Sequence, residues 1–101
     1  DGLCCTAFAA DNDNILFGAV RALEGYHIPV PDRVSVTGFD DIPLAEISDP
    51  PLTSLRVPKQ TMGRIALSLL ATLIDEAPEA PIKITVGTQL IVRKSTGIPA
   101  L

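Results

Sequence analysis

The sequence is poor in the residues from which most catalytic and metal sites are built. Its 101 residues include one histidine, two cysteines, one methionine and no tryptophan. The two cysteines, Cys4 and Cys5, are adjacent and cannot supply a zinc site or a disulfide framework. A lone histidine, His27, gives no partner set for nucleophilic catalysis. We therefore expect no metal, no cofactor and no enzyme activity, and we interpret both thiols as small buried side chains in a reducing cytoplasm.

Long apolar runs and clusters of basic residues are also missing. No stretch approaches the ~18 apolar residues of a membrane-spanning helix, and the start lacks the basic-then-apolar pattern of a signal peptide. The formal net charge is −4, so this segment is poorly suited to contact nucleic-acid phosphates. A hydrophobic content of 47% predicts one compact domain or a piece of a larger one. Because the chain begins Asp1-Gly2 without methionine, we expect an internal fragment.

The most informative stretch that is present runs from Val34 to Asp41. Its valines and threonine favour a strand, which Pro31 and Pro43 bound on either side. The strand ends in a glycine, a phenylalanine and two adjacent carboxylates. In open parallel α/β sheets, ligands collect outside the carboxyl ends of the strands. Asp40 is therefore the first candidate for a functional side chain.

The other elements are predicted from the spacing of apolar residues. An apolar run at residues 3–10 predicts a strand, and apolar residues at intervals of three and four predict a helix from Asp13 to Glu24. With the strand at 34–39, these elements form a β-α-β unit with parallel strands. The rest of the chain predicts a helical turn at 43–47, an extended piece at 54–57, a helix at 59–76, and a strand pair or one bent strand at 83–92.

Polar residues follow both predicted parallel strands, in the loops Asp11–Asn14 and Asp40–Asp41. These loops should face one crevice, where Asn12 and Asp40 could bind a small polyhydroxylated ligand. The alternatives are a helix N-cap for Asn12 and a solvated turn carboxylate for Asp40. His27 should lie at the opposite edge, as a surface or packing residue. An acidic pair can also hold Mg²⁺ in an enzyme or receiver domain, but the lysine expected near it, Lys59, begins a helix instead.

Five motifs, in order along the chain, resemble the lactose/galactose-repressor (LacI/GalR) family of bacterial transcription regulators. Residues 10–23 are similar to the family's A-N-D-x-x-A-x-G-A-x-R-A-L stretch, and residues 28–41 resemble V-P-x-D-V-S-V-x-G-F-D-D. Three shorter matches, to P-P-L-T-T-V, x-G and L-V-x-R-x-S-T, fall at residues 50–56, 62–63 and 90–96. The resemblance implies the C-terminal part of an effector-binding core with the type I periplasmic-binding-protein-like fold.

That fold has two lobes, and the resemblance implies how the chain is shared between them. We expect residues 1–57 in the C-terminal lobe, residues 58–81 as a crossover helix of the other lobe, and residues 82–101 as return strands and tail. The N-terminal helix-turn-helix that reads operator DNA in this family is absent from these residues. A periplasmic solute-binding protein of the same fold remains an alternative.

The resemblance also implies residue roles. Asn12 and Asp40 match positions that bind the effector in relatives, often a sugar. Phe17 and Ile47 match the interface through which relatives form homodimers. We therefore expect a small-molecule effector and a second copy of the chain as partners.

Overall fold

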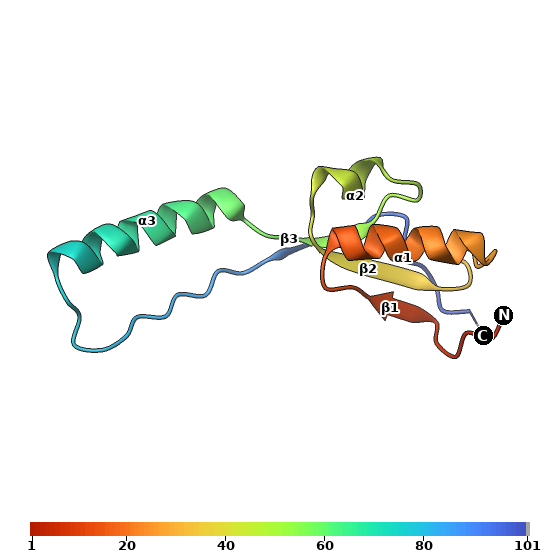
Figure 1. The fold of residues 1–101 in the computed structure, drawn as a ribbon, viewed down its shortest axis with the longest axis horizontal. Helices are drawn as coiled ribbons and strands as arrows, with labels where there is room; N and C mark the ends of the chain where they lie inside the picture. Colours follow the sequence, from red (N-terminus) through yellow and green to blue (C-terminus); the bar gives the residue numbers. More distant parts are fainter. Residues whose placement is uncertain (101) are drawn as a thin grey trace. The chain divides into compact units, whose positions relative to one another are not determined.

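The computed structural model describes residues 1–100, which form one four-stranded sheet and three helices (Figure 1). In chain order the elements are β1 (Ala7–Ala9), α1 (Asp13–Gly25), β2 (Ser35–Asp40), α2 (Pro43–Ile47), β3 (Thr53–Arg56), α3 (Lys59–Asp75) and β4 (Gln89–Ile91). Strands β1, β2 and β3 are parallel and adjacent in that order, whereas β4 pairs antiparallel with β3. The predicted β-α-β start and the helical turn at 43–47 are both present.

The chain divides into two compact units. The first contains residues 1–56 and the chain from Gln89 onward, and it holds the sheet with α1 and α2. The second, Val57–Thr88, holds α3. The division of the chain between two lobes of a larger core stays a prediction.

The core of the first unit lies between α1, α2 and the sheet. Along α1 the side chains of Leu16 and Val20 are buried, one turn apart, and they pack against Val36 of β2. Ala45 of α2 and Leu52 complete the cluster. In Figure 1, α1 runs along β2 and α2 lies beside α1. Each large apolar side chain buried in this way contributes roughly 1.5–3 kcal/mol.

The predicted strand at residues 3–10 is only partly correct. The strand is shorter, Ala7–Ala9, and all three of its residues are exposed. The prediction of buried thiols is wrong, because Cys4 is exposed and Cys5 is half-buried. Among the described residues β1 pairs with β2 alone, so its outer edge has no neighbour to cover it.

The predicted strand at residues 83–92 is also mostly wrong. Only Gln89–Ile91 pair, with Leu90 opposite Leu55 in β3. The alternating apolar residues before them are not in a strand, and Ile82 and Ile84 are half exposed. Alternation predicts a strand only where a partner strand lies alongside, and β3 ends at Arg56, opposite Gln89.

Candidate functional site

Asn12 lies where the chain passes from β1 into α1. Its backbone is extended, and its Oδ1 accepts a hydrogen bond from the Ile15 backbone N–H at 2.9 Å, so it is the N-cap of α1. The backbone N–H of Ala10 donates to the Thr37 carbonyl at 2.9 Å, which keeps this loop beside β2. The capping role considered for Asn12 is therefore confirmed. The cap uses only Oδ1, and the Nδ2 amino group has the chemistry to donate to a ligand.

Asp40 and Asp41 form a sharp bend at the carboxyl end of β2. Their φ angles are 104° and 57°, and the helix α2 begins two residues later at Pro43. Positive φ is costly for residues that carry a Cβ, and such residues are concentrated at functional sites. The bend therefore places Asp40 at the strand end in an unusual backbone conformation that its surroundings must hold.

The carboxylate of Asp41 is bound by two arginines. Its Oδ2 accepts a hydrogen bond from Arg56 Nε at 2.8 Å, and its Oδ1 lies 2.7 Å from Arg93 Nη2. Burial raises the pKa of Asp41, but the two guanidinium groups outweigh burial and hold this pKa below its ordinary value. Two positive groups on one carboxylate disfavour a cation there, and in the described residues no group of three histidine, cysteine or acidic side chains could hold a metal ion.

A buried carboxylate that the sequence pattern did not identify lies between these two loops. Asp13, the first residue of α1, is completely buried. Its Oδ1 accepts a hydrogen bond from Ser54 Oγ at 2.7 Å, and its Oδ2 accepts one from the Ile42 backbone N–H at 2.9 Å. An acidic residue is favoured at the start of a helix by the helix dipole, which is a local effect. Its partners lie 29 and 41 residues away in the chain, and no local pattern predicts them.

The segment after β4 hydrogen-bonds to β2 and β3 near the amino ends of these strands. Ser95 is completely buried, and its Oγ donates to the Val36 carbonyl at 2.7 Å and accepts from the Thr53 N–H at 2.8 Å. Arg93 Nη1 donates to the Leu52 carbonyl at 2.7 Å. These contacts give Arg93 and Ser95 a structural role in tying β2 and β3 together.

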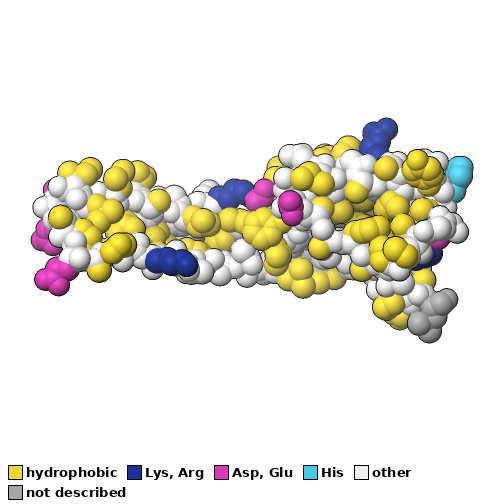
Figure 2. All heavy atoms as spheres, turned by 60° about the horizontal axis from the view of Figure 1, so that its bottom comes forward, with side chains coloured by type: hydrophobic (Ala, Val, Ile, Leu, Met, Phe, Trp, Pro, Cys, Tyr) yellow, Lys and Arg dark blue, Asp and Glu magenta, His cyan; other side chains and the backbone are white. Residues whose placement is uncertain are grey.

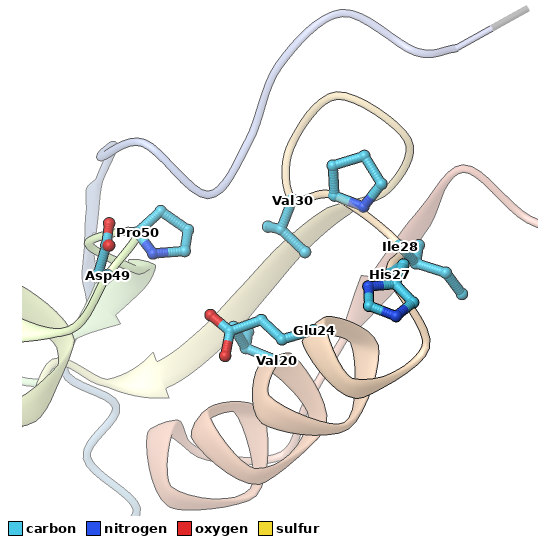
Figure 3. Close-up of a pocket in the computed structure, with 8 residues that line it drawn as sticks. Val20, Glu24, His27, Ile28, Val30, Asp49 and Pro50 are labelled. Atoms are coloured by element: carbon cyan, nitrogen blue, oxygen red, sulfur yellow. The ribbon is translucent and has the colours of Figure 1, made fainter.

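His27 lies away from Asn12 and Asp40, as predicted. It follows the C-terminal end of α1, whereas Asn12 caps the N-terminal end of that helix, and it is exposed. It lines an open groove of about 480 Å³, which is drawn in Figure 3. Two acidic residues also line this groove, Glu24 from α1 and Asp49 from the loop after α2.

Phe17 and Ile47, the residues matched to a homodimer interface, are both on the first unit. The Arg21 guanidinium carbon lies 5.9 Å from the centre of the Phe17 ring, which is half-buried on α1. Ile47 at the end of α2 is 78% exposed. The helices α1 and α2 contact each other, so both residues belong to one helical layer.

The face drawn in Figure 2 shows no cluster of basic side chains. On this face the basic side chains stand singly, and some of them lie beside acidic ones. Within residues 1–100, no helix combines the length and the apolar character needed to cross a bilayer.

Comparison with known proteins identifies the family. The chain matches the family model of the periplasmic binding protein-like domain over residues 4–96. It is 40% identical over 95 residues to the HTH-type transcriptional regulator MalR of Streptomyces coelicolor, which covers 94% of this chain and 28% of MalR. The chain therefore spans less than a third of that relative.

Solved structures agree with this result. A LacI family transcriptional regulator from Arthrobacter sp. FB24, in complex with lactose, is 33% identical with a TM-score of 0.81, over 91% of this chain and 35% of that one. A second, from Enterococcus faecalis V583 with bound ribose, is 32% identical with a TM-score of 0.84, over 94% of this chain and 36% of that one. The chain thus belongs to the periplasmic binding protein-like domain family and, within it, to the LacI/GalR group of transcription regulators.

Proposed function

We propose that this chain is the ligand-sensing portion of a DNA-binding transcription regulator, and that it binds a small-molecule effector, a sugar. The observation that carries the proposal is the bend at Asp40, where a carboxylate is held with a φ of 104° at the carboxyl end of a parallel strand. Asn12 lies at the corresponding end of the neighbouring strand. The similarity to regulators solved with lactose and with ribose supports a sugar.

The two side chains have complementary chemistry for sugar hydroxyl groups. The carboxylate of Asp40 accepts hydrogen bonds from hydroxyls, and the Asn12 amino group donates one. Asp41 is excluded from this role because its side chain is only 4% exposed and its two carboxylate oxygens face Arg56 and Arg93. The effector site is thus assigned to Asn12 and Asp40, and the activity is binding, with no catalysis and no cofactor.

We assign the binding of operator DNA to a helix-turn-helix elsewhere in the full-length protein. The full-length protein is proposed to act in the cytoplasm. The net negative charge of this chain and the absence of a basic patch on the face in Figure 2 support the proposal that another part of the protein contacts DNA. The similarity to an HTH-type regulator favours this function over the periplasmic solute-binding protein considered from the sequence.

The experiment that tests the effector site replaces Asp40 in the full-length regulator. Lactose and ribose are titrated by calorimetry, and the sugar that the parent binds is used throughout. Asp40→Ala removes a charged acceptor, which should weaken affinity about tenfold to a hundredfold. Asp40→Gly is the matched control for folding. It also removes the carboxylate, but glycine adopts the positive φ of this position without the strain that a Cβ causes. Parent-like affinity in both variants would remove Asp40 from the site.

We also propose a homodimer that forms through α1 and α2. The exposed Ile47 on α2 and the half-buried Phe17 on α1 lie on two helices that contact each other, and together they supply apolar surface that a second copy can cover. Phe17→Glu places a charge in that surface and should shift the protein from dimer to monomer in light scattering at micromolar concentration. The variant Tyr26→Glu, at an exposed site after α1, is the control for added charge. A parent protein that is monomeric would contradict this interface.

A further inference from the structure

Asp13 connects three parts of the chain that meet at the carboxyl end of the sheet. It directly follows Asn12, and its side chain is completely buried. Through Oδ1 it accepts from Ser54 Oγ in β3 at 2.7 Å, and through Oδ2 it accepts from the backbone N–H of Ile42 at 2.9 Å. The start of α1, the end of β2 and the strand β3 are therefore joined by one carboxylate.

Ser54 extends this connection to the bend itself. Its Oγ donates to Asp13 and also accepts from the Asp41 backbone N–H at 3.1 Å. The two amides that follow Asp40 are thus both held, one by Ser54 and the other by Asp13. Because the bend passes through two residues at positive φ, these bonds oppose its relaxation to an ordinary backbone path.

The absence of a side chain at Gly38 leaves room for the Asp13 carboxylate. A Cβ added at this buried position of β2 would collide with Asp13 Oδ1 and would lie 3.2 Å from Leu16 Cδ2. A glycine is therefore required wherever the Asp13 carboxylate occupies this place. The cluster of Asp13, Ser54 and Gly38 fits together as one buried unit beneath the bend.

We propose that Asp13 and Ser54 are positioning residues for effector binding, which fix the separation between Asn12 and Asp40. This inference rests on the function proposed above, in which those two residues contact the effector. Asp13 and Ser54 are completely buried and do not contact the effector themselves. Their role is to hold the N-cap of α1 and the bend after β2 in one rigid arrangement.

A purely structural role makes a different prediction from a positioning role. If Ser54 only stabilises the fold, its loss leaves the contact between Asp40 and the effector intact in every molecule that remains folded. If Ser54 positions Asp40, its loss lets the bend relax and removes that contact. A double-mutant cycle between Ser54 and Asp40 separates the two roles.

The cycle is measured on the full-length regulator with whichever of lactose and ribose the parent binds by calorimetry. Asp40→Ala should weaken binding about tenfold to a hundredfold in the parent, and less than about threefold in the Ser54→Ala background. An equal loss in both backgrounds would overturn the positioning role. An Asp40→Ala variant that binds like the parent would instead overturn the proposed effector site.

Ser95→Ala is the matched control. Ser95 is as buried as Ser54 and also bridges β2 and β3, but at the other end of the strand pair. In the Ser95→Ala background, Asp40→Ala should still weaken binding as much as it does in the parent. If it does not, loss of any buried serine between these strands has the same effect, and Ser54 has only a structural role.

Asp13→Asn supplies a second variant if Ser54→Ala does not fold. The amide can still accept from the Ile42 N–H and can donate to Ser54 Oγ, so affinity should stay within a few fold of the parent. Asp13→Ala should lose affinity as Ser54→Ala does. Equal affinities of the two Asp13 variants would contradict the proposal.

Discussion

The helices α1 and α3 carry similar apolar stripes but have different surroundings. In α1 the side chains of Leu16 and Val20 are buried against β2. Along the whole of α3, from Lys59 to Asp75, no residue is buried. Spacing at three and four predicts both helices equally well, because it depends only on the helical period. The difference shows that a stripe becomes a core only where the same unit supplies a sheet to cover it.

The largest expected difference between the helices is in the cost of losing a leucine. Leu16→Ala in α1 should lower the free energy of unfolding by about 2–5 kcal/mol, because Leu16 is completely buried. Leu67→Ala in α3 should cost less than about 0.5 kcal/mol, because Leu67 is 70% exposed. Urea denaturation of the 101-residue chain, followed by circular dichroism, measures both. Equal costs would mean that another chain covers α3.

A smaller difference is expected for two glycines. Gly38→Ala forces a methyl group toward Asp13 and Leu16 beneath α1, and it should destabilise the chain by about 1–3 kcal/mol. Gly63→Ala in α3 meets no atom within 4 Å and should stabilise that helix by about 0.5–1 kcal/mol. The same denaturation experiment checks both, and a neutral Gly38→Ala would show that the buried carboxylate can move aside.

The smallest expected effect is on how the free energy of unfolding depends on pH in the acidic range. The pKa of Asp41 in the folded chain is below its ordinary value because two arginines bind the carboxylate. Its ionised form therefore stabilises the first unit above about pH 4, and this contribution is lost as the pH falls through the lowered pKa. Asp41→Asn should flatten the pH dependence of unfolding in that range. Asp75→Asn on α3 is the control for the loss of one charge, and identical profiles for the two variants would exclude the ion pairs as the cause.

Much of the fold could be predicted because its signals are local. The apolar run before Asp40, the spacing within α1, and the cap at Asn12 each involve residues close together in the chain. The strand predicted at residues 83–92 failed because pairing depends on a distant strand, and β3 reaches only as far as Gln89. The thiols were predicted as buried from residue type alone, but they lie in the segment before β1, which leaves Cys4 exposed and Cys5 half-buried.

The candidate site divides in the same way. Asn12 and Asp40 were identified because each follows a predicted strand, and the structure places them at the ends of adjacent parallel strands. Ser54 and Arg93 fall within motifs that resemble the family, at residues 50–56 and 90–96, but the motifs alone do not reveal what these side chains bind. Their importance follows from bonds to Asp13 and Asp41 that span tens of residues.

The most direct measurement is a crystal structure of the full-length protein with lactose or ribose, whichever it binds by calorimetry. We expect the Asp40 carboxylate and the Asn12 amino group within about 2.7–3.2 Å of sugar hydroxyls. The Asp13–Ser54 bond should be present beneath them at its distance of 2.7 Å. An ordered sugar that contacts neither Asn12 nor Asp40, for example one bound in the groove beside His27, would contradict the account.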